Sequence, residues 1–312
     1  MLKEPTEYAR PTFWQYFSKN KSLYVMLIPG LVCLLLFRYA PMWGLIISFQ
    51  HYHPGLGIAG SKWVGLKHFI DFFNDPYTYR IIRNTILLGG FIILFSFPVP
   101  IIFALILNEI GNTGFKRVSQ TISYLPYFLS IVVVIGLLRD ITGVTDGVIN
   151  AIIAQLGMEK IPFFIQPEWF RPLYIVSDIW QHVGFGSIIY LAAISGINPE
   201  LYESAVVDGA DRFSQIWRIT IPSILPTIII LLILRVGDIL GNDFQKILLM
   251  YSPFTWETAD VISTYIYRVG IESQGANFSY GTAVGFFSAI VSLVFLTAAN
   301  KIAKSLSEYS LW

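Results

Sequence analysis

Long apolar stretches alternate with polar segments along this 312-residue chain. Each stretch approaches the roughly 20 residues that a helix needs to cross a hydrocarbon core of about 30 Å. Because the stretches are apolar all round, their length rather than their periodicity decides the assignment. They predict an all-α polytopic membrane protein with six transmembrane helices, at about 24–48, 81–107, 121–138, 173–197, 222–240 and 281–299.

The composition narrows the function classes. Charged residues make up 13% of the chain, about half of the roughly 25% found in soluble domains. A net charge of +1 provides no field that would attract nucleic acid. The single cysteine, Cys33, cannot form an intramolecular disulfide. His51 and His53 lie in a loop rich in Tyr, Pro and Gly, and we predict no metal site.

Six spans place both termini on one side of the membrane. With the N-terminus inside, the inner segments hold ten Lys and Arg in roughly 70 residues and the outer loops nine in roughly 110, which fits the positive-inside rule. No small-residue cleavage site follows the first stretch, so it should remain as an anchor. We therefore expect a cytoplasmic N-terminal segment over 1–22, a transmembrane domain over 23–301 and a cytoplasmic tail over 302–312.

A charged, glycine-containing segment over 203–222 separates the fourth and fifth stretches on the expected cytoplasmic side. Asn198 can cap a helix that Gly209 ends, because glycine accepts a positive φ. Asp211 can cap a second helix. The segment predicts two short amphipathic helices at a sharp angle, which on their own also fit helices lying among lipid headgroups. In the second, three apolar residues share a face: Phe213, Ile216 and Trp217.

The spacing in this segment resembles the EAA loop of ATP-binding-cassette importer permeases. That pattern runs Glu-Ala-Ala, three residues, Gly, nine residues, Ile, one residue, Leu-Pro. Ser204 and Ile221 depart from it but keep its size or apolarity. In that family the loop couples the permease to a cytoplasmic ATPase. The resemblance assigns this coupling to Glu203, Ser204, Ala205, Asp208, Gly209, Ala210, Phe213, Ile219 and Pro222.

Further segments look like the polysaccharide-type permeases of the maltose-importer class, among them 26–30, 37–44, 120–126 and 309–312. That resemblance implies import of oligosaccharides, including uronic-acid oligomers such as alginate or pectin fragments. It also implies a bacterial inner or plasma membrane and three kinds of partner: a second, homologous permease, two copies of an ATPase and an extracellular binding protein. The chain has no G-x-x-x-x-G-K-[ST] phosphate loop. We therefore expect no bound cofactor and no enzymatic activity, with ATP and Mg²⁺ on the partner ATPase.

A path for sugars requires aromatic platforms and short polar side chains that face a wet cavity. The stretch "GDILGNDFQ" at 237–245 is suggestive, because irregular backbone at membrane depth must be covered by protein or water. The same family resemblance places path residues there, on the fourth span and near the third. They are Tyr124, Tyr127, Gln181, Gly184, Phe185, Asn242 and Asp243.

Two other functions remain open from the sequence. An importer of peptides, amino acids or ions would keep the EAA loop and change only the cargo. A secondary transporter or channel would need ionisable residues inside its spans for ion coupling. The nearest candidates, Asp178, Arg38 and Arg83, lie near span ends or beside loops. The sequence does not name the sugar, because the binding protein usually sets importer specificity.

Overall fold

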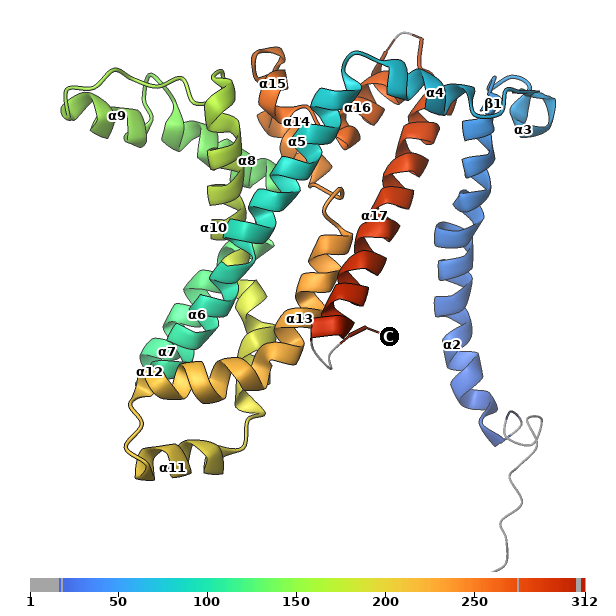
Figure 1. Ribbon diagram of the computed structural model, residues 1–312. Coiled ribbons are helices and arrows are strands. Elements are labelled where there is room, and N and C mark those ends of the chain that lie inside the picture. The colour runs from blue at the N-terminus through green and yellow to red at the C-terminus, as the bar shows by residue number, and fades with distance from the viewer. Residues whose placement is uncertain (1–16, 18, 274, 307–309, 312) are drawn as a thin grey trace, which may run out of the picture.

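The computed structural model describes residues 17, 19–273, 275–306 and 310–311. Most of these residues are helical, and the long helices run side by side between two ends of the molecule (Figure 1). Helix α11 lies at one end of the molecule, and the start of α2 and the end of α17 point toward that end, although both lie away from α11 (Figure 1). Most of the predicted N-terminal segment and part of the predicted tail lie outside the described residues.

The first two predicted spans are present and slightly longer than expected. Residues Lys21–Phe49 form one 29-residue helix and Thr78–Glu109 one of 32 residues. Each helix contains a segment whose turns are wider than those of an α-helix. The first helix also ends in a segment whose turns are tighter. In order, the parts are α2 (Lys21–Leu34), η1 (Leu35–Tyr39), η2 (Ala40–Phe49), α5 (Thr78–Phe91), η3 (Ile92–Ser96) and α6 (Pro98–Glu109).

The third predicted span corresponds to a bent pair of helices rather than to one straight helix. Helix α7 (Thr113–Tyr124) continues into η4 (Leu125–Phe128), and α8 (Ile131–Thr142) follows at an angle of 102°. Leu129 and Ser130 are extended, and the Ser130 hydroxyl accepts a hydrogen bond from the Val133 N–H, which caps α8. A helix end and a new cap therefore fall inside a continuous apolar stretch.

The fifth predicted span begins about ten residues earlier than expected. Helices α12 (Arg212–Gln215), η5 (Ile216–Thr220) and α13 (Ile221–Gly237) form one 26-residue helix, Arg212–Gly237. The predicted second short helix is thus the first part of this long helix rather than a separate element. Pro222 lies inside this helix, directly after the wider η5 turn, and such π-helical turns are places where a proline within a helix is accommodated.

Helices α10 (Pro167–Ser195) and α17 (Phe278–Leu306), each of 29 residues, contain the fourth and sixth predicted spans. Within the described residues, four helices can cross a membrane by length and composition, and the bent α7–α8 pair would make a fifth. Helix α10 is long enough but is interrupted by polar residues such as Asp178, Gln181 and His182. Two of these polar residues, Asp178 and His182, also line the central cavity described below.

Short elements gather at the end of the molecule opposite α11 (Figure 1). Strands β1 and β2 pair antiparallel, with Gln50 opposite Trp63 and His51 opposite Lys62. This small ladder is a minor exception to the predicted all-α fold. The elements are β1 (Gln50–His51), α3 (Gly57–Gly60), β2 (Lys62–Trp63), α4 (Lys67–Asn74), α9 (Val148–Gln155), α14 (Phe244–Met250), η6 (Pro253–Thr255), α15 (Trp256–Ala259), α16 (Ile262–Tyr267) and η7 (Arg268–Glu272).

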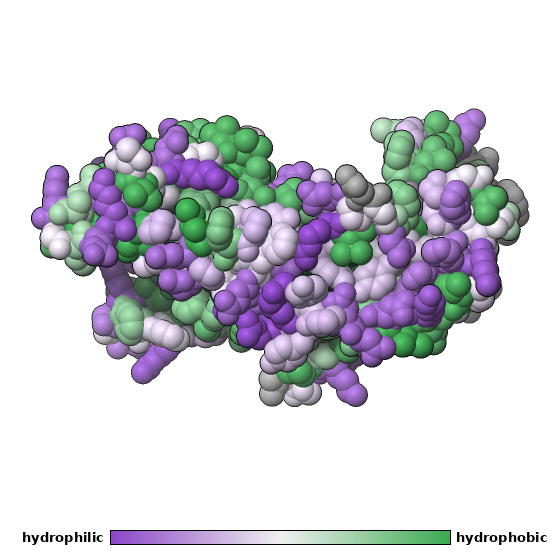
Figure 2. All heavy atoms as spheres, turned by 90° about the horizontal axis from the view of Figure 1, so that it is seen from above, coloured by the Kyte–Doolittle hydropathy of each residue, from purple (hydrophilic) through white to green (hydrophobic). Residues whose placement is uncertain are grey.

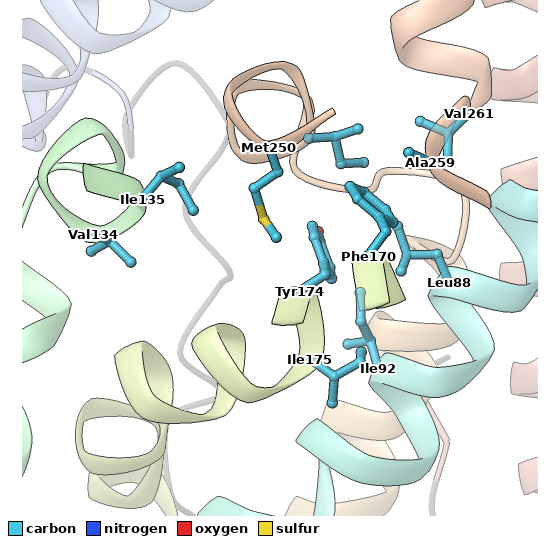
Figure 3. Packing of buried hydrophobic residues seen from close by; sticks show 11 residues of the cluster. Leu88, Ile92, Val134, Ile135, Phe170, Tyr174, Ile175, Met250, Ala259 and Val261 are labelled. Atoms are coloured by element: carbon cyan, nitrogen blue, oxygen red, sulfur yellow. The ribbon is translucent and has the colours of Figure 1, made fainter. Parts of the chain in front are cut away.

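A buried cluster ties these outer elements to the long helices. Tyr174 and Phe170 of α10 lie between Leu88 of α5 and Met250 of α14, with Ile135 of α8 at the side (Figure 3). A second cluster joins α6, α10 and α13 nearer the α11 end. Seen from the end opposite α11, hydrophilic residues are spread over most of this face, and hydrophobic patches lie toward its upper left and upper right (Figure 2).

Candidate functional site: a coupling loop and a central cavity

The loop after α10 forms a short helix with well-defined ends. Helix α11 (Pro199–Val207) begins at Asn198, whose side chain accepts a hydrogen bond from the Glu200 N–H. It ends at Gly209, which has φ +77° as the sequence predicts. The N–H of Ala210 donates to the Ala205 carbonyl and that of Gly209 to the Val206 carbonyl, which is the Schellman arrangement. The glycine spacing of the loop therefore has a structural reason.

The chain then turns directly into the long fifth helix. The Asp211 carboxylate accepts from the Ser214 N–H and caps α12, as predicted. The Gln215 side-chain amide donates to the Ala210 carbonyl at 3.0 Å. The hydroxyls of Tyr202 and Thr220 lie 2.9 Å apart, which joins α11 to η5. These contacts hold the short helix against the start of the long one.

A groove of about 440 Å³ separates α11 from the first turns of α13. Five of the nine predicted coupling residues line it, and Glu203, Gly209 and Ala210 lie on the same loop outside it. Next to the groove, Val207 is 87% exposed. An exposed apolar residue beside a charged groove is typical of a surface that contacts another protein. The lining residues are Leu201, Ser204, Ala205, Asp208, Arg218, Ile219, Pro222 and Ser223.

Phe213, the ninth predicted coupling residue, lies on a different surface. It is 68% exposed and lines an apolar groove with Trp217, Ile216 and residues of α6 such as Ile102. The shared face predicted for Phe213, Ile216 and Trp217 is therefore present. It is turned toward α6 and away from the groove beside α11.

A cavity of about 550 Å³, lined by both polar and apolar side chains, lies in the middle of the molecule. Tyr174, Asp178 and His182 contribute one wall, because residues four apart share a face of α10. Arg235 of α13 and the turn after it contribute a second wall. Helices α5 and α6 complete the lining. Besides those named, it includes Gly89, Ser96, Pro100, Gly186, Tyr190, Leu231, Asp238, Ile239, Gly241, Asn242 and Asp243.

A buried charge cluster supports one side of this cavity. Lys246 is 0% exposed, and its ammonium donates to the Tyr174 carbonyl at 3.1 Å and lies 3.8 Å from Asp178 Oδ1. His182 Nδ1 lies 3.4 Å from the same carboxylate oxygen. Burial lowers the pKa of Lys246 to about 8, and the nearby Asp178 carboxylate opposes this shift. Lys246 therefore offsets the charge of Asp178.

The structure brings only two of the seven predicted path residues into the cavity wall. The Asn242 side-chain amide donates to the Thr85 carbonyl at 3.2 Å. The Asp243 N–H donates to the Tyr174 hydroxyl, and its carboxylate accepts from the Lys246 N–H and caps α14. Both residues thus line the cavity and hold its turn in place.

The other five lie around the break between α7 and α8. The rings of Tyr127 and Phe185 stack at 3.9 Å with an angle of 4° between them. The Gln181 side-chain amide donates to the Leu129 carbonyl at 3.3 Å. A Cβ on Gly184 would overlap the backbone of Ser123, next to Tyr124. Gly184 therefore permits close packing of α10 on α7.

His182 connects the two groups, since it lines the cavity and packs against Tyr127 with ring centroids 5.8 Å apart. Sequence reasoning placed Asp178 among span-end residues and did not consider His182 or Arg235. The helical spacing of Tyr174, Asp178 and His182 was the available signal for one wall. No comparable local pattern marks Arg235.

A second pocket, of about 670 Å³, lies among the outer elements. Arg268 forms two hydrogen bonds with the buried Asp260, at 3.0 and 2.7 Å, and Arg80 lies 3.6 Å from it. The Arg268 guanidinium also lies over the Trp256 ring, 4.5 Å from its centroid. These pairs anchor η7 and α15 to α5 and give the outer face a fixed shape.

Comparison with known proteins decides between the open alternatives. Residues 96–308 match the family described as the binding-protein-dependent transport system inner membrane component. The chain belongs to this family. Its members are transport subunits rather than enzymes, which agrees with the EAA-like loop and argues against a secondary transporter.

Individual relatives are similar over nearly the whole chain. The polygalacturonan/rhamnogalacturonan transport system permease YteP of Bacillus subtilis is 46% identical over 94% of this chain and 91% of its own length. Protein LplB of the same organism is 44% identical, over 95% and 92%. A chain in the crystal structure of a bacterial alginate ABC transporter, in complex with an alginate pentasaccharide-bound periplasmic protein, superposes with a TM-score of 0.87. It is 45% identical, over 96% of this chain and 99% of that one.

Proposed function

We propose that this chain is the membrane-spanning permease subunit of an ATP-driven importer of oligosaccharides, with uronic-acid oligomers as the favoured cargo. One observation carries the proposal: a single helix, Arg212–Gly237, joins the EAA-like loop at one end to the central cavity at the other. The relatives add the cargo class, since polygalacturonan and alginate are both acidic polysaccharides.

The loop around α11 serves as the contact for a cytoplasmic ATPase. Its groove lies beside exposed apolar residues, and its charged residues Glu203 and Asp208 are exposed as well. ATP and Mg²⁺ bind that partner. This assignment places α11, the start of α2 and the end of α17 in the cytoplasm. Six spans result when α10 and the bent α7–α8 pair are each counted as one.

A second, homologous permease completes the translocation path. Residues Lys21–Leu34 of α2 include no buried residue, and this part of the helix stands apart from the bundle (Figure 1). An apolar helix exposed on all sides in one chain is suited to pack against another chain or lipid. An extracellular binding protein docks on the outer elements, as the neighbouring alginate transporter binds a periplasmic protein.

Reconstitution in liposomes tests this function. The permease pair, the ATPase and the binding protein are assembled with ATP inside, and uptake of a labelled galacturonate oligomer is measured. We expect uptake that requires ATP and the binding protein and that persists when ion gradients are dissipated. Uptake driven by an ion gradient without ATP would contradict the proposal.

A further inference from the structure

Arg235 is the cationic side chain in the cavity wall that has no close partner. It lies in the last turn of α13 and lines the cavity. Among the described residues, its guanidinium forms no hydrogen bond or ion pair, whereas Arg80, Arg212 and Arg268 each have an acidic partner. A charged side chain at membrane depth is costly and usually marks a substrate or ion pathway.

Two of the three acidic side chains of the same wall have other partners. Asp178 lies between Lys246 and His182, and the Asp243 carboxylate caps α14. Asp238 is close enough to feel the charge of Arg235. Among the described residues, however, Asp238 forms no hydrogen bond or ion pair with Arg235, and its Oδ1 lies against Gly241. The five donors of the Arg235 guanidinium therefore remain available to a ligand.

We propose that Arg235 binds a carboxylate of the cargo and determines the preference of the cavity for acidic over neutral oligosaccharides. A guanidinium matches a carboxylate with two parallel hydrogen bonds, which lysine cannot reproduce. Lys246 supports this preference from behind the wall by offsetting Asp178, whose charge would otherwise repel an acidic sugar. The inference rests on the proposed function and assigns its specificity to one residue.

The test compares one oligomer in two forms, a galacturonate tetramer and its methyl ester, in the reconstituted importer. For Arg235→Gln we expect uptake of the free acid to fall about tenfold or more relative to wild type, while uptake of the ester changes less than twofold. Arg235→Lys should lie between. For each cargo, uptake by the variant is divided by uptake by the wild type. Any preference of the binding protein for one cargo then cancels. Arg83→Gln, an exposed arginine of α5 outside the cavity, is the matched control.

Equal losses for both cargoes would overturn the inference, because they would assign Arg235 to packing, to the helix end or to an acidic residue of the second permease. Unchanged uptake of both cargoes by Arg235→Gln would overturn it as well. In either case the wild type still takes up the acid, so the proposed function stands. Failure of the wild type with both cargoes would instead count against the proposed function. Recovery of the assembled complex from membranes shows that each variant folds.

Discussion

At the scale of single residues, the best-defined position in the loop around α11 is Gly209. Its φ of +77° creates the turn that brings α11 against the long helix. A Cβ at this position would meet no atom within 4 Å, so conformation alone, not space, restricts it. The position therefore allows a clean test of the loop.

We expect Gly209→Val to lower both uptake and cargo-stimulated ATP hydrolysis by about tenfold, because a β-branched residue strongly disfavours positive φ. Gly209→Asn is the matched control, since asparagine accepts this conformation more readily. Both variants should reach the membrane in normal amounts. Normal uptake and normal cargo-stimulated ATP hydrolysis in Gly209→Val would show that this loop is not the contact for the ATPase.

Gly184 allows a second residue-scale prediction, this time about stability. A Cβ there would overlap the Ser123 carbonyl where α10 crosses α7. We expect the overpacking in Gly184→Ala to reduce the free energy of unfolding by about 1–3 kcal/mol and so to lower the thermal midpoint of the purified complex. Gly136→Ala is the control, because a Cβ at Gly136 meets no atom within 4 Å. Equal midpoints for the two variants would show that the helices separate at no cost.

The Asn242–Asp243 pair combines a structural role with a place in the cavity wall. Alanine at both positions should abolish uptake, but it also removes the cap of α14 and the bond to Thr85. Asp243→Asn separates these roles, because asparagine caps a helix about as well as aspartate. We expect Asp243→Asn to assemble like wild type, as judged by size-exclusion chromatography. Changed uptake in that variant would then report on the cavity itself.

At the scale of elements, the sequence predicted the positions of the apolar helices but not their shapes. Pro126 and Ser130 were visible signals of a helix end and a new cap, yet hydropathy along 121–138 does not register a bend. In the same way, Pro222 looked like the start of a helix. In the structure it lies inside a longer helix that begins at Arg212, next to a wider turn. Local capping at Asn198, Gly209 and Asp211 was predicted correctly, because each depends on a few neighbouring residues.

The cavity was harder to predict than the loop for a physical reason. Its walls come from α5, α10 and α13, which are far apart in the chain. Asn242 and Asp243 were found because they interrupt an apolar run. Tyr127, Gln181 and Phe185 belong to the contact between α10 and the α7–α8 break, where polar and aromatic groups are satisfied by one another.

At the scale of the whole molecule, the orientation in the membrane can be tested directly. In a Cys33→Ser background, single cysteines at Lys62 and Glu159 should react with an impermeant thiol reagent in intact cells. Cysteines at Glu200 and Ser305 should react only after the cells are opened, because both lie at the α11 end. Labelling of Glu200→Cys in intact cells would reverse the topology and remove the loop from the ATPase side.

The continuous Arg212–Gly237 helix can transmit a movement of the α11 loop to the cavity at its other end. At 1.5 Å per residue its 26 residues span about 39 Å. If the partner ATPase tilts the loop end by about 10°, the far end sweeps an arc of roughly 7 Å. That displacement exceeds the length of a hydrogen bond, so under the proposed function a small tilt at the loop end would separate Arg235 from a bound carboxylate.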